Sequence, residues 1–152
     1  TALLLSWLTG SQKRPFLLTA SGNAFVQDMN DGTVDFLDVS AACLSRVADT
    51  IEAFNELLQT PSFVDSYLTP DFIESLRDQG MILKRDQVYS WRVPLSLGGN
   101  TTLDNIEITD VKVHFAVTGQ IERQISAVPA GAPIGKFKIH GLPINKPWWK
   151  FW

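Results

Sequence analysis

The side chains best suited to acid, base or metal chemistry are four aspartates that lie close together, two histidines and one cysteine. The aspartates are Asp28, Asp31, Asp35 and Asp38. The histidines are His114 and His140, and the cysteine is Cys43. Zinc sites draw their ligands from cysteines and histidines at short spacings, and this sequence has no such cluster. The single cysteine excludes an internal disulfide and favours a reducing, cytoplasmic compartment.

The segment Asp28–Gly32 has the composition of a calcium loop but lacks the spacing of one. An EF-hand places a glycine at its sixth position and a glutamate at its twelfth. Those positions hold Thr33 and Val39 in this chain. The glycines also form neither of the common phosphate-binding patterns, G-x-G-x-x-G or G-K-[ST]. We therefore predict that the protein has no metal and no cofactor.

The sequence shows no recognisable nucleophile with its base. Neither a G-x-S-x-G elbow nor a cysteine motif is present. Cys43 lies among apolar residues and is predicted to be a buried, inert thiol. His114 flanks an apolar stripe and His140 ends a predicted strand, so each is interpreted as a structural histidine. The alternative is a small hydrolase or metal-dependent enzyme in which both histidines converge with the Asp28–Asp38 carboxylates.

Charge is distributed unevenly along the chain. Residues 1–78 carry eleven acidic and four basic side chains, a net charge of −7, whereas residues 79–152 carry five and nine, a net charge of +4. An acidic front half disfavours direct binding of nucleic acid and suits a basic protein partner. The alternative for the aspartate cluster is a solvated turn with no partner.

Length and composition are those of one globular domain, with 152 residues of which 45% are hydrophobic and 19% charged. No apolar run approaches the ~20 residues that a membrane-spanning helix requires. The apolar opening Ala2–Leu5 follows no basic stretch, so it is interpreted as a short core helix. We expect an N-terminal helix or arm over residues 1–14, the domain over 15–140 and an aromatic tail over 141–152.

The first half of the chain is predicted to form a meander of hairpins followed by helices. The predicted strands cover residues 16–19, 24–28 and 33–39. Asp49, with Glu52 three residues later, is predicted to cap a helix that ends at Thr60. Thr69–Pro70 then starts another helix, which Gly80 can end.

The second half of the chain is predicted to contain three strands and one segment of ambiguous secondary structure. Predicted strands cover residues 87–93, 105–109 and 134–140. Between them, residues 111–117 alternate as a strand would, whereas a stripe with helical spacing follows a possible N-cap at Asp110. That stripe consists of Val113, Val117, Ile121 and Ile125. Periodicity alone leaves both interpretations open.

The tail contains three of the five tryptophans, Trp148, Trp149 and Trp152. Exposed clusters of tryptophan are uncommon on monomeric proteins. The tail is therefore expected either to pack back onto the domain or to contact a partner. An adaptor that binds another protein through this tail is a further hypothesis for the function.

Several short motifs resemble the C-terminal domain of bacterial type VI secretion immunity proteins, which neutralise DNase effectors. The motifs are Val88–Trp91, Pro94–Gly99, Leu103–Ile106, Asp110, His114 and Gly119–Gln120, with Thr19–Phe25 and Phe36–Asp38 upstream. The resemblance implies an α+β domain with a helix over residues 110–125, and a cytoplasmic protein that binds and blocks a toxin. It implies no catalytic residues. Ser21 and Ser96 depart from the family pattern, where an aromatic residue and an alanine are expected.

The sequence thus predicts an α+β fold in which a small, mostly antiparallel sheet of hairpins packs with three or four helices in a single domain. The predicted function is binding and inhibition of a cognate type VI toxin, a DNase, without catalysis. We expect no direct contact with nucleic acid or membrane. The predicted partner-binding residues are Asp28, Asp31, Asp35, Asp38, Trp148, Trp149 and Trp152.

Overall fold

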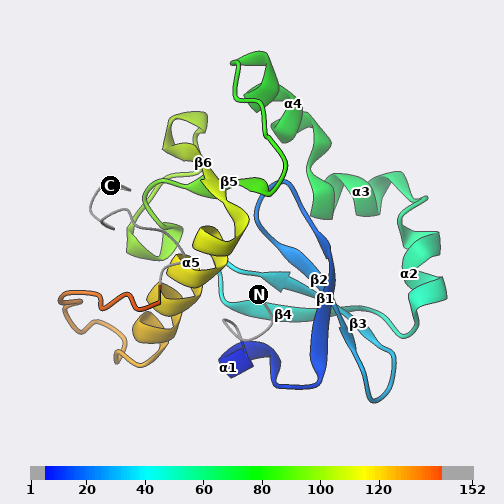
Figure 1. The fold of residues 1–152 in the computed structure, drawn as a ribbon, viewed down its shortest axis with the longest axis horizontal. Helices are drawn as coiled ribbons and strands as arrows, with labels where there is room; N and C mark the ends of the chain where they lie inside the picture. The colour runs from blue at the N-terminus through cyan, green and yellow to red at the C-terminus, as the bar shows by residue number, and fades with distance from the viewer. Residues whose placement is uncertain (1–5, 142–152) are drawn as a thin grey trace.

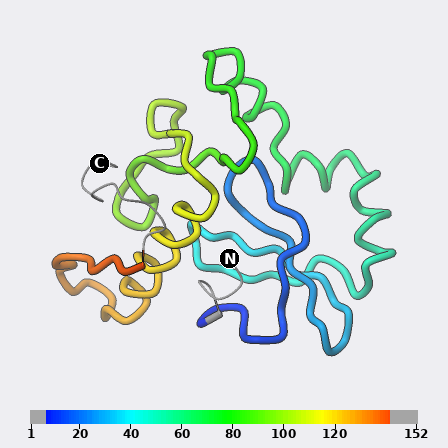
Figure 2. The backbone as a smooth tube through the Cα atoms, in the orientation of Figure 1, coloured from blue at the N-terminus to red at the C-terminus, as the bar shows by residue number. Residues whose placement is uncertain are grey.

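The computed structural model describes residues 6–141, which form the α+β fold that the sequence predicts (Figures 1 and 2). The strands are β1 (Lys13–Leu18), β2 (Ala24–Asp28), β3 (Val34–Asp38), β4 (Cys43–Ala48), β5 (Gln87–Trp91) and β6 (Ile106–Asp110). The helices are α1 (Ser6–Thr9), α2 (Ile51–Leu57), α3 (Pro61–Leu68), α4 (Pro70–Asp78) and α5 (Val111–Ser126). Short 3₁₀ turns, η1 (Leu95–Leu97) and η2 (Leu103–Asn105), lie between β5 and β6.

The first four strands form an antiparallel meander in the order β1-β2-β3-β4. The fourth strand was absent from the sequence prediction, because Cys43–Ala48 lacks a clear alternation of apolar and polar residues. The prediction that Cys43 is buried is also wrong, since its side chain is exposed on this edge strand. An edge strand has a neighbouring strand on one side only. The residue types of such a strand are therefore a poor guide to whether their side chains are buried.

Successive side chains of the meander point to opposite faces, and helices cover both. On one face, Val26 and Leu37 pack against Phe115 of α5. On the other, Phe25 packs against Phe54 of α2, with ring centroids 4.8 Å apart. Figure 1 shows α2 and α3 on one side of the sheet and α5 on the other. The alternation that predicted these strands therefore also separates two hydrophobic clusters.

Local capping signals predicted the helix starts to within one residue. The N-cap of α2 is Thr50, whose hydroxyl accepts a hydrogen bond from the Ala53 amide at 3.1 Å, so the prediction of Asp49 is wrong. Asp49 is solvent-exposed and lies 3.8 Å from Arg46. Thr69–Pro70 precedes a helix as predicted, because proline suits the first helical turn. Thr60–Pro61, predicted only as the end of the preceding helix, also starts one, α3.

The second sheet consists of β5 and β6, and β6 continues without a loop into α5. Asp110 ends the strand and caps the helix, since its carboxylate accepts hydrogen bonds from the Lys112 and Val113 amides. The ambiguous segment is therefore helical. Leu76 of α4 packs with Tyr89 and Ile106 to form a third hydrophobic cluster beside this sheet.

The predicted strand over residues 134–140 is wrong. This segment has no strand partner in the described chain and is held by two side chains of α5 instead. The Lys138 amide donates to the Gln124 side-chain oxygen at 3.0 Å, and the His140 amide donates to the Gln120 side-chain oxygen at 2.8 Å. The side-chain amides of Gln120 and Gln124 lie one helical turn apart. They form hydrogen bonds with the backbone that a neighbouring strand would otherwise form.

His114 joins the two sheets. Its ring Nε2 lies 2.8 Å from the Gly22 carbonyl in the β1–β2 turn, and its Nδ1 lies 2.9 Å from the Ser90 hydroxyl on β5. Because a carbonyl only accepts, Nε2 carries the proton and Nδ1 accepts from Ser90. The Tyr89 amide also donates to the Ala20 carbonyl at 2.8 Å. The β1–β2 turn is thereby fixed against both β5 and α5.

We predict that Gly22→Ala destabilises the protein far more than Gly32→Ala. Both glycines have a positive φ, +78° and +77°, so alanine is strained at either position by about 1 kcal/mol. A Cβ at position 22 would lie 2.5 Å from His114 Nε2, whereas the nearest atom to one at position 32 is 4.0 Å away. We expect urea unfolding to show a further loss of ~1–3 kcal/mol for Gly22→Ala. Equal losses in the two variants would contradict the close packing of His114.

We also predict that His114 makes stability depend on pH. Burial lowers the pKa of His114 from 6.5 to about 4. The unfolded chain therefore takes up a proton as the pH falls through 6.5, while the folded protein does not until about 4. The free energy of unfolding should fall across this range by up to about 3 kcal/mol. In urea titrations, His114→Gln should reduce this pH dependence, and the control His140→Gln, at an exposed site, should not.

Candidate functional site

The aspartates of the β2–β3 hairpin differ in what they contact. In the turn, Asp28 accepts a hydrogen bond from the Asn30 amide at 2.8 Å. Asp31 accepts from the amide and the hydroxyl of Thr33 at 3.0 and 2.6 Å. The Thr33 hydrogen bonds lower the pKa of Asp31, and the Asn30 amide, followed by Lys13, lowers that of Asp28. Both carboxyls are therefore ionised at neutral pH, and Asp31 is exposed.

Asp35 is buried, and two cationic side chains compensate the negative charge of its carboxylate. It is 4% exposed, and its carboxylate contacts Lys13 Nζ at 2.5 Å and Arg46 Nε at 2.8 Å. Lys13 also contacts Asp28, with Nζ 3.2 Å from Oδ2, so a series of ion pairs connects all four strands of the meander. Asp35 thus fixes the sheet from within, and its carboxylate is turned toward these cations.

Asp38 lies apart from this network, at the edge of a groove. Its carboxylate accepts a hydrogen bond from the Ala41 amide at 3.0 Å in the β3–β4 turn. The groove has a volume of about 700 Å³ and lies where the meander meets the second sheet. Its lining comes from the β1–β2 and β3–β4 turns, the α3–α4 junction, β5, η1 and α5. Ser21 and Ser96, the two departures from the family pattern, both line it.

Glu122 forms the α5 side of the groove. It is 6% exposed, and Ser96 donates a hydrogen bond to its Oε1 at 2.5 Å. Burial raises the pKa of Glu122, Ser96 opposes that effect, and the charge of Asp38 adds to it. The sequence analysis missed this residue, although a signal existed. His114, Thr118 and Glu122 follow one another at i, i+4 and therefore share one face of the helix.

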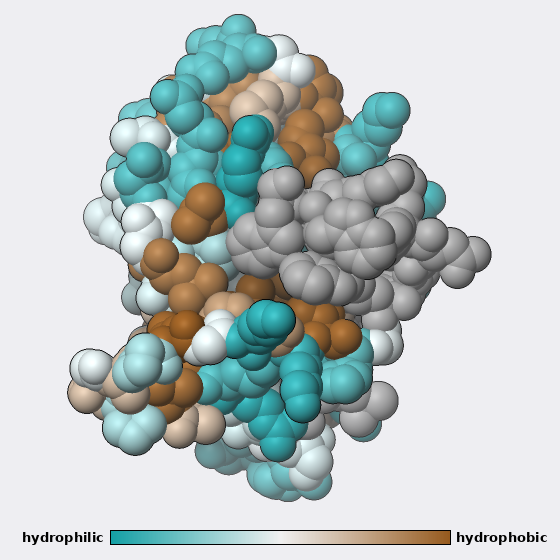
Figure 3. Space-filling model, turned by 90° about the vertical axis from the view of Figure 1, so that its left-hand side faces the viewer, coloured by the Kyte–Doolittle hydropathy of each residue, from teal (hydrophilic) through white to brown (hydrophobic). Residues whose placement is uncertain are grey.

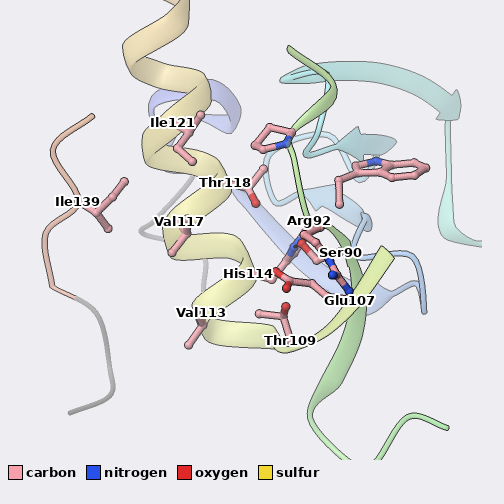
Figure 4. A pocket seen from close by; sticks show the side chains of 12 residues that line it. Ser90, Arg92, Glu107, Thr109, Val113, His114, Val117, Thr118, Ile121 and Ile139 are labelled. Atoms are coloured by element: carbon pink, nitrogen blue, oxygen red, sulfur yellow. Dashed lines mark hydrogen bonds between the residues drawn. The ribbon is translucent and has the colours of Figure 1, made fainter. Parts of the chain in front are cut away.

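Ser90 and His114 form a hydroxyl–imidazole pair that the sequence analysis did not foresee. Their side chains come from β5 and α5, 24 residues apart, and a nucleophile with its base has this geometry. Figure 4 shows them in a small cavity of about 50 Å³, with Val113, Val117 and Ile121 turned toward Ile139. No motif in the sequence predicts this pair, because the two residues meet only in the folded chain.

The surroundings of this pair limit its reactivity. His114 is 3% exposed, and its pKa of about 4 makes the neutral ring a poor proton acceptor at pH 7. Its other nitrogen bonds the Gly22 carbonyl, which links the ring to the β1–β2 turn. The observed contacts suit a structural link between segments better than proton transfer.

The remaining candidate residues are not brought together. The His140 side chain is exposed, and its backbone is bound by Gln120, whereas the His114 ring bonds Gly22 and Ser90. Over residues 6–141, no group of three His, Cys, Asp or Glu side chains could hold a metal ion. The same residues contain no helix long and apolar enough to cross a bilayer. Trp148, Trp149 and Trp152 lie outside the described residues.

Apolar side chains also reach the surface on the face that carries α5 and the segment after it. Figure 3 shows them in the middle of this face, with hydrophilic residues above and below. Ile134 is 43% exposed and Val93 42%. Such residues are available for contact, although singly exposed apolar residues are common on monomers.

Comparison with known proteins places part of the groove within a recognised family segment. No curated protein matches the chain. A family model described as "T6SS immunity protein Tdi1, C-terminal", where T6SS denotes the type VI secretion system, matches residues 48–122. The match runs from the last residue of β4 through α2–α4 and the second sheet into α5, and includes Ser90, His114 and Glu122. Residues 48–122 are thus similar to the C-terminal domain of type VI secretion immunity proteins.

Proposed function

We propose that this protein binds a cognate type VI toxin in the cytoplasm and inhibits it, and that the toxin is a DNase. The family match over residues 48–122 carries the proposal. The acidic front half supports the choice of a DNase, because a cleft that binds DNA is basic and attracts negative charge. Inhibition requires only that the bound protein occlude the cleft, so no catalytic residue is needed.

The proposed toxin-binding surface includes the acidic hairpin. Asp28 and Asp31 carry negative charge at neutral pH, and Asp31 is exposed at the tip. Asp35 contributes by holding the hairpin in place through Lys13 and Arg46. Asp38 presents its carboxylate at the groove. We extend the proposed surface to the tail tryptophans Trp148, Trp149 and Trp152, because aromatic side chains are enriched where proteins bind one another.

The alternative function is that of a hydrolase, and the Ser90–His114 pair is the observation that favours it. Against it stands the low pKa of His114, which makes the neutral ring a poor proton acceptor. A hydrolase would also need donors placed around a developing oxyanion. A non-enzymatic role therefore agrees better with the contacts.

We predict that Asp31→Lys slows association with the toxin, encoded by the adjacent reading frame. Exposed charges steer binding, so we expect the association rate to fall by about tenfold and its salt dependence to change. The matched control is Asp65→Lys, which makes the same charge change on exposed helix α3. Binding kinetics and protection of co-expressing cells are the measurements. Identical kinetics for both variants would remove the hairpin tip from the interface. A parent chain that binds no toxin would refute the proposed function itself.

We predict that Ser90→Ala still protects cells against the toxin. The variant lacks the hydroxyl that donates a hydrogen bond to Nδ1 of His114. Its free energy of unfolding should therefore be lower by about 1 kcal/mol. Neither the parent nor the variant should hydrolyse nucleic acid, peptide or ester substrates. The hydrolase alternative would instead be established by an activity present in the parent and absent from the folded variant.

A further inference from the structure

The groove between the two sheets carries negative charge with no internal counter-charge. Asp38 and Glu122 line it from opposite elements, the β3–β4 connection and α5. No lysine, arginine or histidine is among its lining residues in the described chain. Asp35, by contrast, is buried against two cations. The two acidic sites of the molecule are therefore built differently.

Of the two groove carboxylates, Glu122 has the greater need of a positively charged partner. More than nine-tenths of the residue is buried, and Ser96 binds only its Oε1. Within residues 6–141, Oε2 has no hydrogen-bond or ion-pair partner. A buried carboxylate without a cation is costly, and Asp38 increases that cost by repulsion. A cation that entered the groove would relieve both effects.

The rest of the lining suits a flat cation with an apolar stem. Phe72 and Trp91 line the groove with ring centroids 6.3 Å apart and planes tilted by 41°. Aromatic faces attract cations, and a guanidinium group stacks on them while it binds carboxylates with two N–H groups. The volume of about 700 Å³ is sufficient for such a side chain.

Thr69 is an unusual residue of the groove wall. It lies at the α3–α4 junction on the groove wall, with a backbone φ of +46° that is unusual for a β-branched residue. Its hydroxyl is buried without a hydrogen-bond partner in the described chain. Strained backbone and unsatisfied buried polar groups occur together at binding sites.

We propose that the groove receives an arginine side chain of the bound toxin, whose guanidinium pairs with Glu122 and Asp38 and stacks on Trp91. This inference rests on the proposed immunity function and specifies one contact of that complex. It places the centre of recognition at the junction of the two sheets, in addition to the acidic hairpin. The toxin supplies the positive charge that the groove lacks.

The first test uses the full chain and no toxin. The probe is N-acetylarginine methylamide, and its neutral isostere, N-acetylcitrulline methylamide, is the control ligand. In ¹H–¹⁵N NMR titrations, the indole N–H signal of Trp91, assigned with Trp91→Phe, should shift saturably with the arginine probe alone. Glu122→Gln keeps an acceptor for Ser96 but removes the charge, and should weaken binding at least about tenfold. Glu107→Gln, on β6 outside the groove, is the matched variant and should bind normally.

No saturable shift, an equal response to citrulline, or unchanged binding by Glu122→Gln would each overturn the inference. The second test measures toxin dissociation. We expect Glu122→Gln to release the toxin at least about tenfold faster than the parent and Glu107→Gln do. Full affinity in Glu122→Gln would overturn the arginine contact and leave the immunity function standing. Failure of the parent chain to bind any toxin would overturn both proposals.

Discussion

The architecture depends on the buried ring of His114, which lies between the β1–β2 turn and β5. Each ring nitrogen has one partner, and each partner belongs to a different sheet. The ring must remain neutral to be buried there, and the absence of a side chain at Gly22 lets the backbone approach it. This link sets how the meander faces the second sheet. The polar contacts of this ring therefore contribute to the shape of the groove at their junction.

Within residues 6–141, the fold places cations beside one buried carboxylate, Asp35, and none beside the other, Glu122. Asp35 is held by Lys13 and Arg46, so its charge is satisfied inside the sheet and stiffens the acidic hairpin. Glu122 has only the Ser96 hydroxyl, and its raised pKa reflects a charge that the fold leaves uncompensated. Paired buried charges serve structure, whereas an unpaired one beside a groove is a feature of binding sites.

The proposed immunity function gives these features a common purpose. An inhibitor of a toxin needs a rigid surface of suitable shape and charge, and the fold provides rigidity where its two sheets meet. The family segment supplies β5, α5 and the α3–α4 junction, while the meander adds Asp38 and the acidic hairpin. In the proposed complex, the recognition surface is therefore assembled from both parts of the described chain.

The sequence by itself determined the elements whose signals are local. Strand β2 and the helix start at Thr69–Pro70 follow from residues within one hairpin or helical turn. Only the tertiary structure decided the burial of Asp35 and Glu122, the absence of a strand over residues 134–140 and the pairing of Ser90 with His114. Gly22 and His114 are 92 residues apart. Whether a polar side chain is buried, and by what it is satisfied, depends on partners that distant, and no local pattern encodes them.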